Sequence, residues 1–93
     1  MRFRQILSRI DRHADLFERM TAKLGLRNDL AELNNVGPVY RRAAMRCLSC
    51  DKAEECAAWL DIRNEPANAP DYCRNRGLFS RLKASHALQH ELK

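Results

Sequence analysis

The positions of four cysteines are the strongest constraint on how this short chain folds. The spacing is C-x2-C-x5-C-x16-C, so three cysteines are close in sequence and one is remote: Cys47, Cys50, Cys56 and Cys73. A chain of 93 residues is long enough for one domain and too short for two. Because a domain of this size buries only a little over ~60% of its unfolded surface, its core leaves a thin stability margin. We therefore predict that the four cysteines form one stabilising site.

The expected compartment decides how the cysteines are interpreted. Charges at Arg9, Asp11 and Arg12 interrupt the N-terminal apolar residues, so we expect no secretory signal. No apolar run approaches the ~20 residues that a membrane span requires, and we expect a cytoplasmic protein with no membrane partner. Thiols stay reduced in the cytoplasm, which favours metal coordination over disulfides. Disulfides and free structural thiols remain the alternatives.

The N-terminal part of the chain shows the clearest helical pattern. Gly25 suits the left-handed position that often follows a last helical turn. Asp29, followed by Glu32, resembles a capping box and predicts a short helix through Leu33. The long pattern before Gly25 consists of apolar residues at helical spacing: Phe3, Ile6, Leu7, Ile10, Ala14, Phe17, Met20 and Leu24.

The C-terminal part also predicts helices and no strand. A helix is expected to begin at Gly37-Pro38 and to run into the cysteines, since proline is tolerated in a first turn. Asp51 resembles the start of a helix over 52–62, and residues 64–71 resemble a loop. We predict an all-α fold, a small single-domain bundle of about four to five helices organised around the four-cysteine site. Its parts are a long N-terminal helix over 1–25, a cysteine-containing segment over 38–75 and a C-terminal helix over 75–93.

The spacing of the cysteines favours iron over zinc. Four thiolates suit both a zinc ion and an iron–sulfur cluster. Structural zinc sites usually combine two short cysteine pairs, whereas iron–sulfur sites often combine three local cysteines with one distant cysteine. The run Cys47, Cys50 and Cys56 resembles part of the cluster motif of helical DNA glycosylases of the endonuclease III type, whose remaining cysteine lies upstream. We predict an iron–sulfur cluster of the [4Fe-4S] type, with zinc as the alternative.

Several neighbours of the cysteines are candidates for a supporting role. Arg46, Lys52 and Arg74 adjoin the predicted ligands, and their charge is expected to favour the thiolate form. His13 lies close to the apolar stripe of the first helix, so it either points toward the site or is packed or partly exposed. Tyr72 either donates a hydrogen bond to a thiolate sulfur or simply packs.

Composition argues against an enzyme that works with protein side chains alone. With three glycines, the chain has no glycine-rich phosphate loop, and no serine lies in a nucleophile elbow. A cysteine nucleophile paired with His13 remains an alternative, but four cysteines at ligand spacing fit coordination better. The excess of 17 Lys and Arg over 12 Asp and Glu is dispersed. Nucleic acid is therefore a weakly supported partner.

A series of short sequence landmarks extends over most of the chain: Arg12-His13-Ala14-Asp15-Leu16, Arg19-Met20, Leu24-Gly25, Arg46-Cys47-Leu48-Ser49-Cys50, Cys56-Ala57-Ala58-Trp59-Leu60 and Ala69-Pro70-Asp71-Tyr72-Cys73-Arg74-Asn75. Through these landmarks the chain resembles small domain-of-unknown-function proteins that are common in alphaproteobacteria. The resemblance implies a bacterial, mainly helical, single-domain protein with all four cysteines in place, and it implies no activity.

Two functional hypotheses follow from the sequence. The first is a redox or accessory protein whose cluster carries or senses electrons for an unknown partner protein, docked near Cys47 to Cys56. The second is a zinc-stapled helical module, in which the metal supplies folding energy and a basic face binds protein or nucleic acid.

Overall fold

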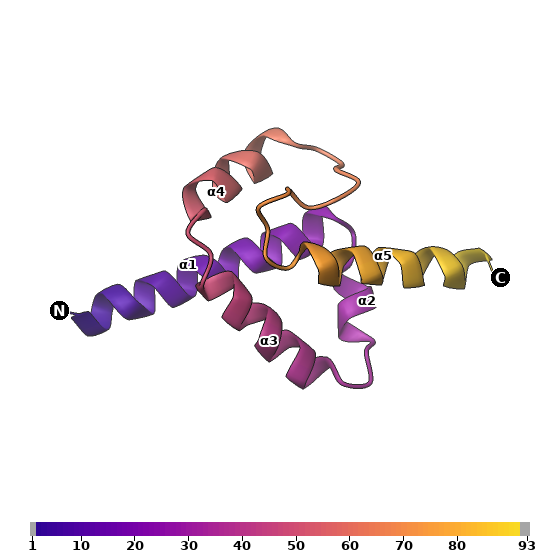
Figure 1. Ribbon diagram of the computed structural model, residues 1–93, viewed down its shortest axis with the longest axis horizontal. Coiled ribbons are helices and arrows are strands. Elements are labelled where there is room, and N and C mark those ends of the chain that lie inside the picture. The colour runs from indigo at the N-terminus through magenta and orange to yellow at the C-terminus, as the bar shows by residue number, and fades with distance from the viewer. Residues whose placement is uncertain (1, 92–93) are drawn as a thin grey trace.

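The computed structural model describes residues 2–91, and this part of the chain contains five helices and no strand (Figure 1). The all-α prediction is therefore confirmed. Met1, Leu92 and Lys93, the ends of the predicted terminal helices, lie outside the described residues. None of the helices within residues 2–91 combines the length and the apolar character that a membrane span needs. The helices are α1 (Arg2–Lys23), α2 (Arg27–Ala31), α3 (Val36–Leu48), α4 (Ala53–Ile62) and α5 (Arg76–Glu91).

The end of α1 confirms the role predicted for Gly25. Its φ angle is +71°, in the left-handed region that glycine adopts without a steric penalty. The Leu26 N–H donates to the Thr21 carbonyl and the Gly25 N–H donates to the Ala22 carbonyl, both at 3.0 Å. These two bonds form a Schellman motif, and Leu26 is buried against the core. The backbone thus turns sharply at the end of α1 and leads directly into α2.

The predicted capping roles of the two aspartates are wrong. Asp29 lies inside α2, which begins at Arg27, and its carboxylate contacts the His86 ring of α5 at 2.8 Å. Asp51 precedes α4, whose N-cap residue is Lys52 with no side-chain capping bond. The Lys52 N–H instead donates to the Cys50 sulfur at 3.4 Å. Asp29 therefore makes a tertiary contact in place of a cap. Before α4, a backbone N–H bonds to a cysteine sulfur and not to an aspartate side chain.

The core lies where α1 crosses the later helices. α1 packs against α3 and α4, while α2 packs against α1 and α5. The Phe17 ring stacks on Phe79 with centroids 5.8 Å apart and meets Tyr40 edge-on at 5.4 Å. Such aromatic pairs are more favourable than their buried area alone would make them. The buried apolar residues are Leu16, Phe17, Met20, Leu24, Leu26, Leu30, Ala43, Leu60, Ala69, Leu78, Phe79 and Leu82.

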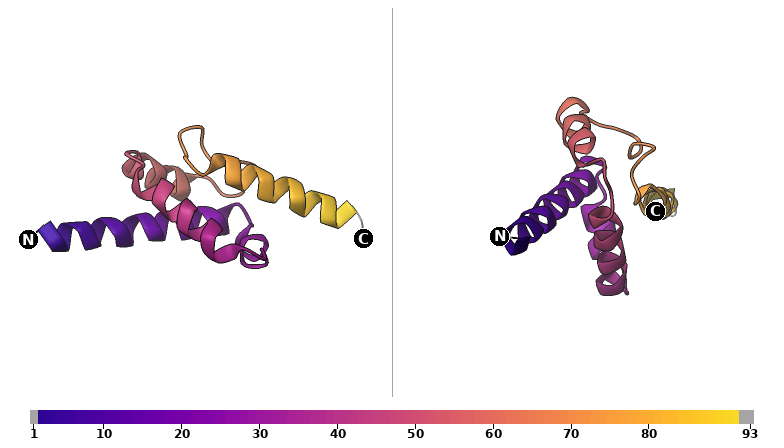
Figure 2. Two further views of the ribbon diagram at one scale, coloured as in Figure 1. Left: turned by 60° about the horizontal axis from the view of Figure 1, so that its bottom comes forward. Right: turned by 60° about the vertical axis from the view of Figure 1, so that its left-hand side comes forward.

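The first half of α1 projects away from this core. The molecule measures 53 × 30 × 17 Å, and the N-terminal part of α1 and the C-terminal part of α5 extend in opposite directions (Figure 2). Phe17 is 3% exposed, whereas Phe3 on the same predicted apolar stripe is 71% exposed. The stripe is thus continuous along the helix, but only its second half is covered. The other exposed members are Ile6, Leu7, Ile10 and Ala14.

Candidate metal centre

The four cysteines line one small cavity, which we call the cysteine cavity. Cys47 lies in the last turn of α3, Cys50 in the turn after it, Cys56 in α4 and Cys73 in the loop before α5. The cavity has a volume of about 30 Å³. Segments that are remote in sequence therefore meet at this cavity. The remaining lining residues are His13, Leu16, Phe17, Met20, Ala53, Asn75 and Phe79.

The four cysteines around the cavity are free thiols. Each of the four is partly buried. Among the described residues, no group of three or more His, Cys, Asp or Glu side chains is arranged to hold a metal ion as it stands. Metal binding by the four cysteines therefore stays a prediction, and it requires that the thiols turn further into the cavity that they share.

Burial raises the pKa of three of the thiols, those of Cys47, Cys56 and Cys73. It is the largest cause that raises the pKa of Cys47 to about 11, and the charges of the other three cysteines raise it further. Burial also raises the pKa of Cys56 to about 11, although Arg19 lowers it. The pKa of Cys73 is raised by burial and lowered by a hydrogen bond from the Asn75 backbone. A metal that bound here would have to displace these protons.

The side chains of the arginines and the lysine next to the cysteines contact groups other than the thiols. Arg46 bonds to Asn75, and Lys52 forms an ion pair with Glu55 at 3.6 Å. The Arg74 guanidinium reaches the Ser49 hydroxyl at 3.5 Å. The cation that lowers the pKa of a thiol is Arg19 of α1, near Cys56 only in the folded chain. The effect expected of Arg46, Lys52 and Arg74 on the thiolates stays a prediction.

His13 points into the cysteine cavity, as one of its two predicted orientations required. It is 4% exposed, and its Nδ1 lies 2.8 Å from the Arg9 carbonyl oxygen. Its Nε2 lies 3.2 Å from the Cys50 carbonyl oxygen. Both partners are acceptors, so the neutral ring donates to one of them and the imidazolium donates to both. The Cys47 thiol donates to the His13 carbonyl at 3.4 Å, which ties α1 to both cysteines of the C-x2-C turn.

Tyr72 has a buried hydroxyl without a hydrogen-bond partner among the described residues. Its pKa is raised, first by burial and then by the charges of Cys56 and Glu55 and of other cysteines. The hydroxyl thus lies within electrostatic range of the thiols and has a proton to donate. An unpaired buried hydroxyl costs about 1–3 kcal/mol, so an acceptor brought within reach of Tyr72 would stabilise the fold.

Asn75 is a supporting residue that the sequence analysis missed. It is 3% exposed, and its amide nitrogen donates to the Ala43 carbonyl of α3 at 2.9 Å. Its amide oxygen accepts from the Arg46 Nε at 2.8 Å. These bonds tie the loop that carries Cys73 to the helix that carries Cys47. An asparagine just before a helix normally indicates a cap, so the sequence held no signal for this role.

Comparison with known proteins places the chain in a family but assigns it no activity. The family described as "Family of unknown function (DUF6455)" matches residues 4–85, which include all four cysteines and His13. No curated protein and no solved structure matches the chain.

Proposed function

The chain belongs to the family of unknown function DUF6455, and we propose that it is a small metal-binding protein that holds an iron–sulfur cluster on Cys47, Cys50, Cys56 and Cys73. It serves as a redox or accessory protein for a partner protein. The observation that carries the proposal is the meeting of all four cysteines, from two helices, a turn and a loop, at one cavity. A bacterial origin and a cytoplasmic location, where thiols stay reduced, are parts of the same proposal.

The chain's own residues fit such a group. Four thiols match the donor number of a tetrathiolate site, and an iron–sulfur cluster supplies one-electron transfer when bound. Phe17, Met20 and Phe79 give the cavity an apolar lining. The partial exposure of the cysteines leaves the site close to the surface, where a partner exchanges electrons. Tyr72 supplies the O–H donor that sulfur ligands accept.

The alternative function is a zinc-stapled module that binds a partner through a helical face. The observation that favours it is the size of the cysteine cavity. A volume of about 30 Å³ exceeds the ~10–15 Å³ that one water molecule requires, which suits a single ion. Zinc would then contribute folding energy and no redox chemistry.

Metal and acid-labile sulfide analysis of the full chain separates these functions. The protein is purified anaerobically without a metal-binding tag, and its visible spectrum is recorded. We expect brown protein with iron, sulfide and broad absorption near ~400 nm. One zinc per chain without colour would establish the alternative. No metal together with oxidised cysteines would refute both.

A cysteine substitution tests the four-ligand premise directly. Cys73→Ser removes the remote ligand and is expected to lower the metal content and the stability of the fold. Ser49→Ala is the matched control, because Ser49 lies between Cys47 and Cys50 but has an exposed side chain. Full metal content in Cys73→Ser would show that the site does not use four ligands.

The salt dependence of binding tests the nucleic-acid form of the zinc alternative. A protein that neutralises phosphates with Lys and Arg loses affinity steeply as salt rises, because counterions are released on binding. The net charge of +5 makes this outcome measurable. A flat salt response would remove nucleic acid from the set of partners.

A further inference from the structure

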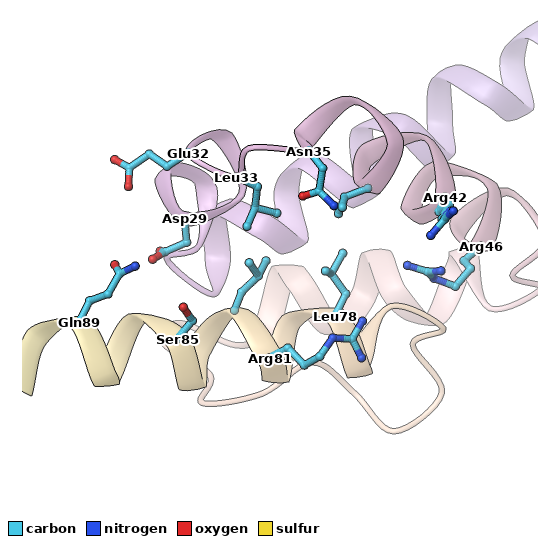
Figure 3. Close-up of a pocket in the computed structure, with 12 residues that line it drawn as sticks. Asp29, Glu32, Leu33, Asn35, Arg42, Arg46, Leu78, Arg81, Ser85 and Gln89 are labelled. Carbon is cyan, nitrogen blue, oxygen red and sulfur yellow. The ribbon is translucent and has the colours of Figure 1, made fainter.

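A second cavity lies on a different part of the molecule from the cysteines. It has a volume of about 360 Å³ and opens between α5 and the segment that contains α2 and α3 (Figure 3). We call it the arginine cleft. This volume is within the range of small-molecule sites, which are mostly apolar with a few polar groups at fixed positions. Its apolar wall is formed by Leu33, Val39, Leu78 and Leu82.

Three guanidinium groups gather at one end of this cleft. Arg42 and Arg46 extend from α3 and Arg81 extends from α5, so that the two sides of the cleft converge on the same end (Figure 3). Asp29 and Glu32 lie at the opposite end. The charges within the cleft are therefore separated, with the positive end next to an apolar wall.

The arginines are free to bind a ligand. Within the described part of the chain, neither Arg42 nor Arg81 has an ion-pair or hydrogen-bond partner. Arg46 is oriented by the bond from its Nε to Asn75, and its two terminal nitrogens have no acceptor among residues 2–91. Three like charges at one end of a cleft repel one another, and an anion between them relieves this repulsion.

We propose that the arginine cleft binds a small organic anion with an apolar body. Its phosphate or carboxylate head contacts Arg42, Arg46 and Arg81, because guanidinium groups match these planar or multidentate anions. Its apolar body lies along the wall formed by Leu78 and Leu82. Asp29 and Glu32 at the far end repel a second negative charge, which excludes long polyanions and selects a ligand charged at one end.

Isothermal titration of the full-length protein tests this site with defined probes. Octyl phosphate and octanoate, below their micelle concentrations, carry the two candidate heads on the same apolar body. Inorganic phosphate carries the head alone, and octyl glucoside carries the body with a neutral head. We expect the two octyl anions to bind more tightly than either partial probe, and the tighter of them identifies the head group.

Substitutions localise the binding to the cleft. Arg42→Gln and Arg81→Gln are each expected to weaken binding of the tighter anion about tenfold, since each removes a charge-assisted contact. Both side chains belong to exposed residues, so the fold should be retained. Arg41→Gln is the matched control, because it removes the same charge from an exposed position on α3 outside the cleft.

Three outcomes would overturn the proposal. Equal affinity for octyl glucoside would mean that the arginines do not select an anion. Equal affinity for inorganic phosphate would mean that the apolar wall does not contribute. A loss of affinity in Arg41→Gln as large as in Arg42→Gln would mean that net charge acts without a defined site. None of these readouts requires bound metal, so the test is independent of the function proposed for the cysteines.

Discussion

Burial of the Cys47 and Cys56 thiols has two opposing consequences. Their burial protects them from solvent, but it also opposes the thiolate form that binds metal. The raised pKa belongs to the metal-free fold. Since metal stabilises the thiolate, the binding of the proposed metal would replace a proton on each of these sulfurs and reverse the effect of burial.

The first prediction concerns the reactivity of these two thiols. In metal-free folded protein, Cys47 and Cys56 should react slowly with iodoacetamide at neutral pH, because the thiolate is the nucleophile and their pKa is about 11. The rates, measured by peptide mass spectrometry, should rise steeply toward that pH. The same protein unfolded in urea is the control. Rapid alkylation of both residues in the folded protein near neutral pH would contradict the prediction.

The raised pKa of Cys47 also makes the stability of the folded state depend on pH. The folded pKa lies above the ordinary thiol value of 9.0, so the folded state holds the proton more tightly than the unfolded state. The stabilisation is therefore complete below about pH 9 and is lost as the pH rises through about 11. Metal-loaded protein should not show this loss from these two residues, because its thiols are already deprotonated.

The second prediction concerns the unpaired hydroxyl of Tyr72. Tyr72→Phe should stabilise the metal-free protein by about 1 kcal/mol in urea unfolding, because it removes a buried donor without a partner. In a cluster-loaded protein the same change should lower the reduction potential, since a hydrogen bond to sulfur stabilises the more negative reduced form. Tyr40→Phe is the control, because the Tyr40 hydroxyl already donates to Glu18 at 2.8 Å and no cysteine contributes to its raised pKa. Destabilisation of metal-free Tyr72→Phe would show that the hydroxyl has an acceptor.

At the scale of elements, α1 is one helix with two environments. Its second half supplies the centre of the core, whereas its first half carries the same apolar stripe into solvent. Amphipathic periodicity reports which residues share a face and says nothing about whether another element covers that face. This distinction leads to a matched pair of substitutions within one helix.

The third prediction compares two phenylalanines of α1. Phe17→Ala should destabilise the fold by about 3–5 kcal/mol, since it removes a ring packed against Tyr40 and Phe79 and leaves a cavity. Phe3→Ala should change stability by no more than about 0.5 kcal/mol, because the ring is exposed. Both values come from chemical denaturation of the same metal-loading state. Equal losses would mean that the first half of α1 is covered in solution.

The fourth prediction concerns the contact between α3 and the loop before α5. Asn75→Ala should cost about 1–3 kcal/mol, because the Ala43 carbonyl and the Arg46 guanidinium lose a buried partner. Asn68→Ala, in the exposed part of the same loop, is the control. If Asn75 positions Cys73, the variant should also bind metal more weakly at temperatures where it remains folded. Unchanged stability and metal affinity would show that the contact is incidental.

The fifth prediction concerns the whole molecule and removal of the metal that we propose it binds. A ligand that binds only the folded state stabilises it by about 2.7 kcal/mol when present at 100 times its Kd. For a chain of this length, stripping the metal should therefore lower the Tm by at least about 10 °C. Cys73→Ser should show a much smaller difference between loaded and stripped samples. Equal melting temperatures for loaded and stripped wild-type protein would refute a stabilising metal site.

Much of the helical architecture could be predicted because its signals are local. The Gly25 turn and the start of α3, which has Pro38 in its first turn, depend on residues that are adjacent in sequence. The errors at Asp29 and Asp51 arose because a carboxylate followed by glutamate resembles a cap wherever it occurs. In the fold, Asp29 instead contacts His86, which is distant in sequence. Local patterns do not report such competing partners.

The candidate site also has features that local sequence predicts and features that depend on contacts between remote segments. The sequence by itself determined the helices, their apolar faces and the four thiols as one candidate set, because periodicity and residue type are local properties. Only the tertiary structure brought the Cys73 loop beside α3 and α4, turned His13 toward the Cys50 carbonyl and left the Tyr72 hydroxyl without a partner. The arginine cleft likewise exists only because α5 lies opposite α2 and α3. Burial, pKa shifts and convergent charges depend on distances between remote segments, and folding alone sets those distances.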